Sequence, residues 1–479
     1  MDGHAGIPQE VRLLFNGLRT LSGSEVEGLI QSSGKVLSKG LTLSRKGATP
    51  LITPDRQINR LSRVVISLEK SLASPYAAAI KMALWHVLGG RQRLTYFDAT
   101  HFRDYIWRNL FAKTLSFEDF DVVTKAGFRV LQVPWSAMHG LALATQKIGF
   151  AVYPRINTSD FDVLIAETPF PALVSKTTTL VVRYHDAIPI LMPHTISDKS
   201  YHQASHYRAL RSNVQNGAYF ACVSEATRSD LISIFPEAES RSTTIHNMVS
   251  HHYFPEESSA KRVNEIVSTR KNQIVTNQAK VPRDRLEIQN EQLFDYLLIV
   301  STIEPRKNHT TLLAAWEQLR TECYSKLKLV VVGMLGWDHE PIVKKFLPWV
   351  ERGELHVLED VPSPELRLLY KHARATICPS FGEGFDFSGV EAMRSGGAVV
   401  ASDIAVHREI YAEAAEFFNP YSIGELVKAV VAVVDPLHND RRTCLVEEGA
   451  VVSKRYLPSV ILPKWQEFLG ALKTQQFRN

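Results

Sequence analysis

The sequence predicts an α/β protein made of two halves, each built on a parallel sheet. Short apolar runs alternate with helical segments from residue 129 onward, and the same alternation resumes at residue 296. Such alternation is typical of parallel strands covered by helices. A charged segment with few aromatic residues, 253–292, lies between the two series and is interpreted as a linker. A chain of 479 residues is also too long for one hydrophobic core.

The first 125 residues give a weaker pattern than the rest of the chain. An apolar run at 11–15 is interpreted as the first strand, a helix is expected over 22–30, and 64–67 is read as a second strand. Residues 74–87 and 101–113 look helical. The regular series then begins, with apolar runs expected to be strands at 129–133, 163–166, 180–184, 218–223 and 243–245.

The second half repeats the alternation with clearer boundaries. Its helices have good start signals, such as Ser363-Pro364, because a proline in the first turn loses no hydrogen bond. A helix at 457–473 closes the chain. The strands expected here are 296–301, 327–332, 355–358, 375–378 and 398–401.

The stretch 378–401 is the one around which the chain is organised. It reads as a strand end, a loop broken by Gly382 and Gly384, a short helix, a glycine stop and the next strand. Two carboxylates, Glu383 and Glu391, stand with seven residues between them. Both would lie beside a helix N-terminus, where backbone N–H groups attract anions.

Glu391 has a second, structural interpretation. Ser388 is a good N-cap, and Ser388 with Glu391 fits a capping box, in which the Glu side chain reaches back to the cap. Gly396 and Gly397 form a good helix stop. Glu383 has no such explanation, because it stands between two glycines with no helix to stabilise.

Composition excludes several classes of protein. The net charge of +5 is mild and no basic block exists, so no nucleic-acid partner is expected. Residues 1–135 hold 18 Lys and Arg against 11 Asp and Glu. This excess of positive charge is larger than the net charge of the whole chain. This basic section is either a solvated face or a contact to the inner face of the cell membrane.

The cysteines and the hydropathy predict a cytoplasmic chain. The four cysteines have no metal-ligand spacing and are expected to be reduced. No signal peptide pattern and no run of 18 apolar residues is present.

Two patterns look like metal sites and are interpreted as structural. The D-x-D triplets at 119–121 and 160–162 each precede an apolar run instead of ending one, which suits a turn. His202 and His206 have helical ligand spacing but no acidic partner. No metal is therefore expected.

Polar residues follow two of the expected strands. His185 and Asp186 end the run 180–184, and Arg306 with Lys307 follow the run 296–301. In parallel sheets this edge faces the crevice where ligands bind. Arg and Lys together suit a diphosphate, although an Arg-Lys pair can also be a solvated surface pair, and His185 can instead be satisfied by local backbone. We favour the functional interpretation for both.

These motifs, taken in order, resemble the retaining glycosyltransferases of family 4, which have the GT-B fold of two Rossmann-like domains facing a cleft. The resemblance runs from about Asp162 to the C-terminus. Its motifs are His-Asp-x-x-Pro at 185–189, Glu-Pro-Arg-Lys-Asn-His at 304–309 and the E-x7-E signature of Glu383 and Glu391. The nearest kind within the family is a bacterial polysaccharide mannosyltransferase.

The resemblance implies roles for individual residues. Arg306 and Lys307 correspond to the pair that binds the donor diphosphate, Glu383 to the Glu beside the reacting centre, and Glu391 to the Glu that binds the ribose. His185 corresponds to the histidine that faces the sugar. The loop implied to contact the sugar and the phosphate consists of Gly384, Phe385, Asp386 and Phe387. The loop implied to contact the nucleobase contains Asp360 and Val361.

Two departures from the family pattern stand out. Asp386 replaces a glycine where the backbone should approach the sugar, so it either contacts a hydroxyl or helps to cap the helix. The usual glycine-rich loop after the first strand is absent, and residues 33–125 match nothing in the pattern.

The resemblance implies a retaining hexosyltransferase that needs no metal and no other cofactor. Its partners would be a nucleotide sugar, GDP-mannose before a UDP-sugar, and a glycan or lipid-linked acceptor of polysaccharide or lipopolysaccharide synthesis. A nucleotide-sugar 2-epimerase of the same fold and a non-catalytic sugar-nucleotide-binding protein are the alternatives. The implied domains are an acceptor domain at 1–252 with an extra segment at about 33–125, the linker 253–292, a nucleotide-sugar domain at 293–455, and a helix at 456–479 that crosses back to the first domain.

Overall fold

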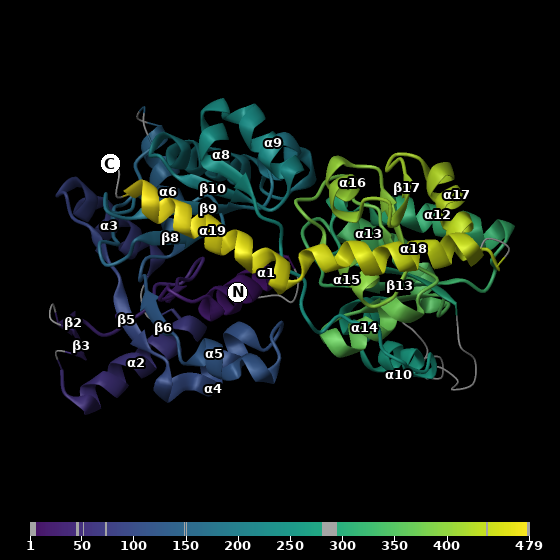
Figure 1. The fold of residues 1–479 in the computed structure, drawn as a ribbon, viewed down its shortest axis with the longest axis horizontal. Helices are drawn as coiled ribbons and strands as arrows, with labels where there is room; N and C mark the ends of the chain where they lie inside the picture. The colour runs from purple at the N-terminus through teal and green to yellow at the C-terminus, as the bar shows by residue number, and fades with distance from the viewer. Residues whose placement is uncertain are drawn as a thin grey trace.

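The chain folds into two lobes that lie side by side (Figure 1). The purple and blue part of the chain lies in the N-terminal lobe and the green part in the C-terminal lobe, while the last yellow helix returns to the N-terminal lobe. The structure is a computed structural model, and it describes residues 6–44, 47–50, 52–71, 74–147, 149, 151–279, 295–436 and 439–476.

The C-terminal lobe is built on a six-stranded sheet in the order β14-β13-β12-β15-β16-β17, with every pair parallel. The order reverses between β12 and β15, so the loops that follow these two strands diverge and leave a crevice at the carboxyl edge. The strands are β12 (Tyr296–Val300), β13 (Lys328–Val332), β14 (Leu355–Leu358), β15 (Ala375–Cys378), β16 (Val399–Ser402) and β17 (Ala415–Phe418).

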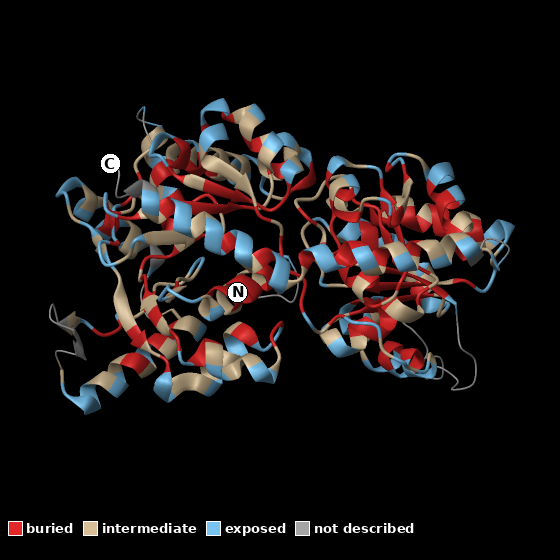
Figure 2. Ribbon diagram, viewed as in Figure 1, coloured by how far each residue is buried: buried red, intermediate tan, exposed pale blue. Residues whose placement is uncertain are grey.

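Helices cover both faces of this sheet, and Figure 2 shows the strands as its buried centre. Alternate residues of one strand belong to different clusters: Leu298 packs on one face, while Leu297 and Ile299 pack on the other. Burial on both faces explains why these strands read as continuous apolar runs. The helices of this lobe are α10 (Lys261–Thr269), α11 (Gln273–Gln278), α12 (His309–Glu322), α13 (Glu340–Glu351), α14 (Ser363–His372), α15 (Phe387–Arg394), α16 (Ala405–Tyr411), α17 (Ile423–Val434) and α18 (Asn439–Val452).

The N-terminal lobe contains a parallel four-stranded sheet in the order β11-β10-β9-β8 and a three-stranded sheet in the order β1-β6-β5. In the second sheet β1 runs parallel and β5 antiparallel to β6. The strands of the lobe are β1 (Gly28–Ile30), β2 (Leu43–Ser44), β3 (Gly47–Pro50), β4 (Gln92–Arg93), β5 (Thr95–Asp98), β6 (Gly127–Val130), β7 (Ile156–Asn157), β8 (Val163–Ala166), β9 (Thr179–Tyr184), β10 (Tyr219–Cys222) and β11 (Ser242–Thr244).

Three predictions for the first 70 residues are wrong. The run 11–15, read as a strand, lies inside the helix α1, the segment 22–30 ends in β1 instead of forming a helix, and the run 64–67 lies inside α2. Helix α1 buries residues at helical spacing, but several of them are polar, so the short apolar run misled the interpretation. The helices of the lobe are α1 (Ile7–Thr20), α2 (Pro54–Glu69), α3 (Pro75–Val87), α4 (Arg103–Ile106), α5 (Phe120–Thr124), α6 (Trp135–Gln146), α7 (Ile188–Leu191), α8 (Lys199–Gln215) and α9 (Glu225–Ile234).

Two helices form within the segment read as a linker, whereas its first residues, 253–260, are not helical. Helices α10 and α11 pack against α14 and α13 of the C-terminal lobe, and α10 buries Val263, Ile266 and Val267. Residues 280–292 of the expected linker lie outside the described residues.

The chain crosses between the lobes at two places that touch each other. The first crossing follows β11: Met248 packs in the N-terminal lobe and Val249 in the C-terminal one. The second is the turn at Ser453–Tyr456, between α18 and the last helix, α19 (Pro458–Gln476). The Val249 N–H donates to the Tyr456 carbonyl over 2.8 Å, which joins the two crossings.

Helix α19 lies along the N-terminal lobe, as the last yellow helix in Figure 1 shows. Its Ile461 and Trp465 pack in the same cluster as Leu14 and Leu18 of α1. No described helix combines the length and the apolar character needed to cross a membrane.

Candidate active site

The two loops at the reversal point of the six-stranded sheet bring three charged side chains together. The loop after β12 carries Arg306 and Lys307, and the loop after β15 carries Glu383. Arg306 Nη1 lies 2.8 Å from Glu383 Oε2, and Lys307 Nζ lies 2.5 Å from Glu383 Oε1. The side chains are 13%, 14% and 6% exposed respectively, so all three are largely shielded from water. The structure therefore joins residues 76 positions apart in the sequence.

Glu304 adds a second carboxylate to this group. Its Oε1 accepts from Arg306 Nη2 over 2.8 Å, and burial raises its pKa. Burial also acts to raise the pKa of Glu383, but the charges of Arg306 and Lys307 outweigh it and hold that pKa below its ordinary value. Two cations thus face two carboxylates, and an incoming anion has to compete with Glu383 for its partners.

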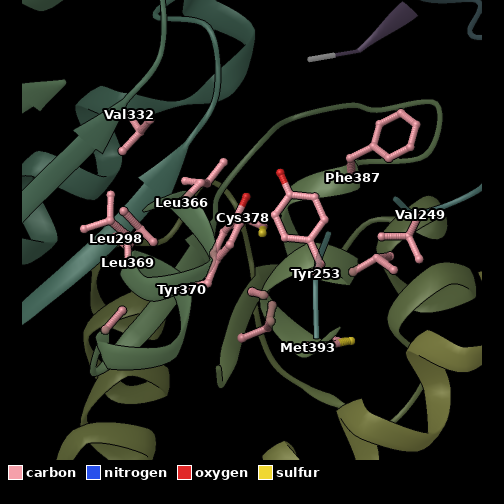
Figure 3. Packing of buried hydrophobic residues seen from close by; sticks show 14 of the residues in the cluster. Val249, Tyr253, Leu298, Val332, Leu366, Leu369, Tyr370, Cys378, Phe387 and Met393 are labelled. Atoms are coloured by element: carbon pink, nitrogen blue, oxygen red, sulfur yellow. The ribbon is translucent and has the colours of Figure 1, made fainter. Parts of the chain in front are cut away.

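Glu391 lies in a different environment on α15. It is 4% exposed, its Oε1 accepts from Gln9 Nε2 over 2.7 Å, and its Oε2 accepts from the Tyr370 hydroxyl over 3.0 Å. Burial raises its pKa to about 7, although hydrogen bonds from Gln9, Tyr370 and Tyr253 oppose that rise. Figure 3 shows Tyr253 and Tyr370 close together in this part of the core. A ribose hydroxyl would have to replace one of these donors.

The capping-box interpretation of Glu391 is wrong, and so is Ser388 as the N-cap. The N-cap of α15 is Asp386, whose Oδ1 accepts from the Ser388 N–H over 3.2 Å and from the Ser388 hydroxyl over 2.6 Å. The helix begins two residues earlier than expected, so Glu391 lies beyond the position from which it could reach the cap.

Asp386 combines an unusual backbone with a fully engaged side chain. Its φ of 59° lies in the left-handed region that favours glycine, which agrees with the glycine of the family pattern. Its Oδ2 lies 3.2 Å from His407 Nε2. Burial acts to raise the pKa of Asp386, but His407, Lys307 and Ser388 bring it well below its usual range. Of the two interpretations, the structure favours the cap.

His185 stands at the carboxyl end of β9, facing the loop of Glu383. A Cβ atom on Gly384 would lie 1.8 Å from the His185 carbonyl oxygen, so only glycine permits this approach of the two lobes. His185 Nε2 lies 3.4 Å from Glu167 Oε2 without hydrogen-bond geometry, and neither atom has a hydrogen-bond partner within the described residues. Two buried polar atoms therefore remain available at the junction.

Glu167, Gln9 and Glu10 are among the residues of this site that were missed in the sequence. Glu167 follows β8 just as His185 follows β9, so its place after a strand was a usable signal. Gln9 and Glu10 come from α1, where no signal pointed to the site. Arg183 binds Glu10 in a buried ion pair of 2.8 Å, which fixes the start of α1 against the N-terminal sheet.

The remaining predicted residues contribute backbone more than side chains. Phe385 and Phe387 are 3% and 8% exposed and pack against each other, so only their backbone groups can meet a ligand. The same holds for Val361, which is 7% exposed and packs in the core near α10. Asp360 follows β14 at the same carboxyl edge of the sheet, with a φ of 50°.

The carboxylate of Glu409 makes a further contact between the lobes at their junction. Glu409 of α16 accepts from the Glu225 and Ala226 N–H groups at the start of α9, over 2.7 and 2.9 Å. His246 Nε2 lies 2.8 Å from the same carboxylate. Burial acts to raise the pKa of Glu409, but these partners hold it below its ordinary value. The contact places an anion at a helix N-terminus across the junction.

The two aspartates of the first D-x-D triplet have structural partners. Asp121 pairs with Arg103 and Lys125, and Asp119 accepts from Asn16. Within the described ranges, no three His, Cys, Asp or Glu side chains are arranged to hold a metal ion. The expectation that no metal is needed stays a prediction.

Residues 283–442 match the family model described as Glycosyl transferases group 1. The O-antigen chain mannosyltransferase B of Escherichia coli is 26% identical over 51% of this chain and 58% of its own length. The serotype-specific mannosyltransferase WbdA of Escherichia coli is 34% identical over 28% of this chain and 16% of its own. The chain thus spans little more than half of the first relative and a sixth of the second.

Solved structures resemble the whole arrangement. The sucrose-phosphate synthase of Thermosynechococcus elongatus has a TM-score of 0.54 at 13% identity, over 98% of this chain and 94% of that chain. The Anabaena protein HepE, in complex with UDP and glucose, has a TM-score of 0.51 at 16% identity, over 74% and 89%. At such identity the likeness shows the fold alone, and the predicted GT-B fold of two Rossmann-like domains is confirmed.

Proposed function

We propose that this protein is a glycosyltransferase that moves a hexose, with mannose favoured, from a nucleotide diphosphate sugar to a glycan or lipid-linked acceptor. The observation that carries the proposal is the group of Arg306, Lys307 and Glu383 at the reversal point of the six-stranded sheet. Ligands of such sheets bind at that point, and two cations suit a diphosphate. The group 1 match covers these residues.

The donor diphosphate is proposed to take the place of Glu383 at one or both cations. Fixed cations in a shielded site stabilise the negative charge that develops as the sugar–phosphate bond breaks. Glu383, released from part of its pairing, then lies beside the sugar, and His185 approaches from the other lobe. No metal is required for the leaving group in this scheme.

Transfer is proposed to retain the anomeric configuration, with the acceptor oxygen attacking from the side on which the diphosphate leaves. The acceptor hydroxyl then gives its proton to a departing phosphate oxygen, and the new glycosidic bond replaces the broken one. His185 Nε2 and Glu167 Oε2, which have no hydrogen-bond partner among the described residues, are proposed to orient the sugar or the acceptor hydroxyl.

GDP-mannose is proposed as the donor, since two matched relatives are O-antigen and serotype-specific mannosyltransferases. A UDP-sugar is the second choice, because HepE was solved with UDP and glucose. The acceptor is proposed to be a growing polysaccharide on a lipid carrier, which would bring the protein to the inner face of the cell membrane.

The test is turnover of GDP-mannose and UDP-glucose with a lipid-linked glycan acceptor, with the anomeric configuration of the product read by NMR. Lys307→Ala should lower turnover about a hundredfold, as loss of one electrostatic contact to a transition state does. Lys125→Ala is the matched control, because Lys125 also pairs with a carboxylate but on the exposed surface.

Other outcomes separate the alternatives. A near-normal rate for Lys307→Ala would rule out the proposed diphosphate site. Conversion of the donor to an epimer without acceptor would identify a nucleotide-sugar 2-epimerase. Nucleotide binding by calorimetry, with no turnover on any acceptor, would indicate a binding protein.

A further inference from the structure

Helix α3 exposes an apolar face on the outer surface of the N-terminal lobe. Ile80, Leu84, Val87 and Leu88 are 63%, 62%, 83% and 78% exposed. Their spacing of four, seven and eight residues from Ile80 puts all four on one side of the helix, with Leu88 directly after its last turn. Met82 lies on the opposite side, is 1% exposed, and packs in the core of this lobe near α6.

This arrangement inverts the ordinary pattern of a surface helix. A helix on a soluble protein turns its apolar stripe to the core and its polar face to water. In α3 the buried and half-buried positions among the described residues are Ala78, Ala79, Met82, Ala83 and His86, while the large aliphatic side chains face outward. Contiguous exposed apolar surface of this kind marks an interaction site.

The end of α3 is held in a fixed shape. The Trp85 indole lies against Gly90, where a Cβ atom would come within 2.3 Å of Nε1, and Nε1 donates to the Arg91 carbonyl over 3.3 Å. Trp85 is 50% exposed at the edge of the apolar face. Tryptophan is enriched at membrane–water boundaries, where its ring is apolar and its N–H is polar.

The segment that carries this face has charges of one sign. Between Glu69 and Asp98 the sequence contains no carboxylate, and it contains Lys70, Lys81, Arg91 and Arg93. All four cations are exposed. An apolar helix face in a segment whose only charged side chains are exposed cations is complementary to a bilayer with anionic headgroups.

We propose that α3 docks the N-terminal lobe onto an anionic lipid bilayer, with Ile80, Leu84, Val87 and Leu88 entering the headgroup boundary and the four cations lying over the headgroups. A second copy of this chain fits the face less well, because two α3 helices would bring cations together with no carboxylate in the segment to pair them. Figure 1 shows α3 at the outer end of its lobe, away from the C-terminal lobe, so docking leaves the junction uncovered. The inference deepens the proposed function, since a lipid-linked acceptor lies in the same bilayer.

The test measures binding of the full chain to vesicles by sedimentation and by Trp fluorescence, without donor or acceptor. Vesicles with about one-third phosphatidylglycerol should bind, and pure phosphatidylcholine vesicles should bind at least tenfold more weakly. Val87→Glu should weaken binding to the anionic vesicles at least tenfold. Val451→Glu is the matched control, because it makes the same change at a 62% exposed position of α18, and it should bind as the unchanged protein does.

Three outcomes would overturn the proposal. They are equal binding to both vesicle types, undiminished binding by Val87→Glu, and a self-association that Val87→Glu abolishes in sedimentation velocity. Thermal unfolding of both variants checks that the fold is kept. Vesicle binding without sugar transfer would support the docking and contradict the proposed function. Sugar transfer to a water-soluble acceptor without vesicle binding would support the proposed function and contradict the docking.

Discussion

The surroundings of Glu383 and of Glu391 differ sharply, although the two residues belong to one loop and helix. Glu383 faces two cations, which hold its pKa below the ordinary value. Glu391 faces only neutral donors in a buried site, where its pKa rises to about 7. The spacing in the sequence places the two carboxylates, but it does not set the pKa of either one. Each pKa is set by neighbouring groups that come from distant parts of the chain.

The largest expected difference between the two carboxylates is in turnover. Glu383→Gln removes the negative partner of Arg306 and Lys307 beside the reacting centre, and it should lower kcat about a hundredfold. Glu391→Gln keeps a side chain that can hydrogen-bond with Tyr370 and Gln9, and it should lower kcat less than about tenfold. Steady-state rates with the preferred donor measure both. Equal losses in the two variants would contradict the comparison.

The next effect is the dependence of stability on pH. Between pH 4.5 and about 7 the folded protein holds a proton on Glu391 that the unfolded chain has released, so the free energy of unfolding falls as pH rises. The contribution is fully present below pH 4.5 and decreases by at most about 3 kcal/mol by pH 7, at about 1.4 kcal/mol per pKa unit. Glu383, with a lowered pKa, acts in the opposite sense, since its contribution is lost as pH falls through that pKa.

Urea unfolding at pH 5 and pH 8 checks this sign. The unchanged protein should lose more stability between the two pH values than Glu391→Gln, which cannot titrate. Glu447→Gln, at an exposed position of α18, is the control and should behave as the unchanged protein. A pH dependence that survives in Glu391→Gln would assign the effect to other groups.

The smallest effect is expected from the partner in the other lobe. Gln9→Ala removes one donor to Glu391 and should destabilise the protein by about 1–2 kcal/mol, because a buried acceptor loses a hydrogen bond. It should also raise the pKa of Glu391 further, so the loss of stability with pH should extend to higher pH. Chemical unfolding over a pH series measures both. The reference is Gln318→Ala, whose amide binds Glu322 on the exposed surface of α12.

The strands of both parallel sheets were largely predictable from the sequence. Strands buried on two faces are continuous apolar runs, and β8, β9 and β12 lie within a residue of where the runs predicted them. Helix α1 was not predicted because its buried face includes Gln9, Glu10 and Arg12, which pair with distant partners. With polar residues on its buried face, the helix lacks a clear helical spacing of apolar residues. The buried polar residues of α1 can be recognised as buried only when their partners in the fold are known.

The candidate site also has a part that the sequence predicted and a part that it did not. Arg306 and Lys307 were expected at the carboxyl edge of a parallel sheet, and the family resemblance implied that Glu383 lies beside the same donor. The contact of Gln9 with Glu391 joins residues 382 positions apart and depends on how the two lobes dock. Sequence periodicity describes each element separately, so it carries no information about such docking.

The two crossings between the lobes restrict how the molecule can open. Val249 and Tyr456 are bonded to each other, so both connections act as a single pivot. Motion about one pivot is a rotation, and it separates most widely the groups farthest from that point. Glu409 and the first turn of α9 form a contact between the lobes, and this contact has to break if the lobes move apart there. If this contact breaks slowly, its breaking, and not the chemistry of sugar transfer, would limit the overall rate of the proposed reaction.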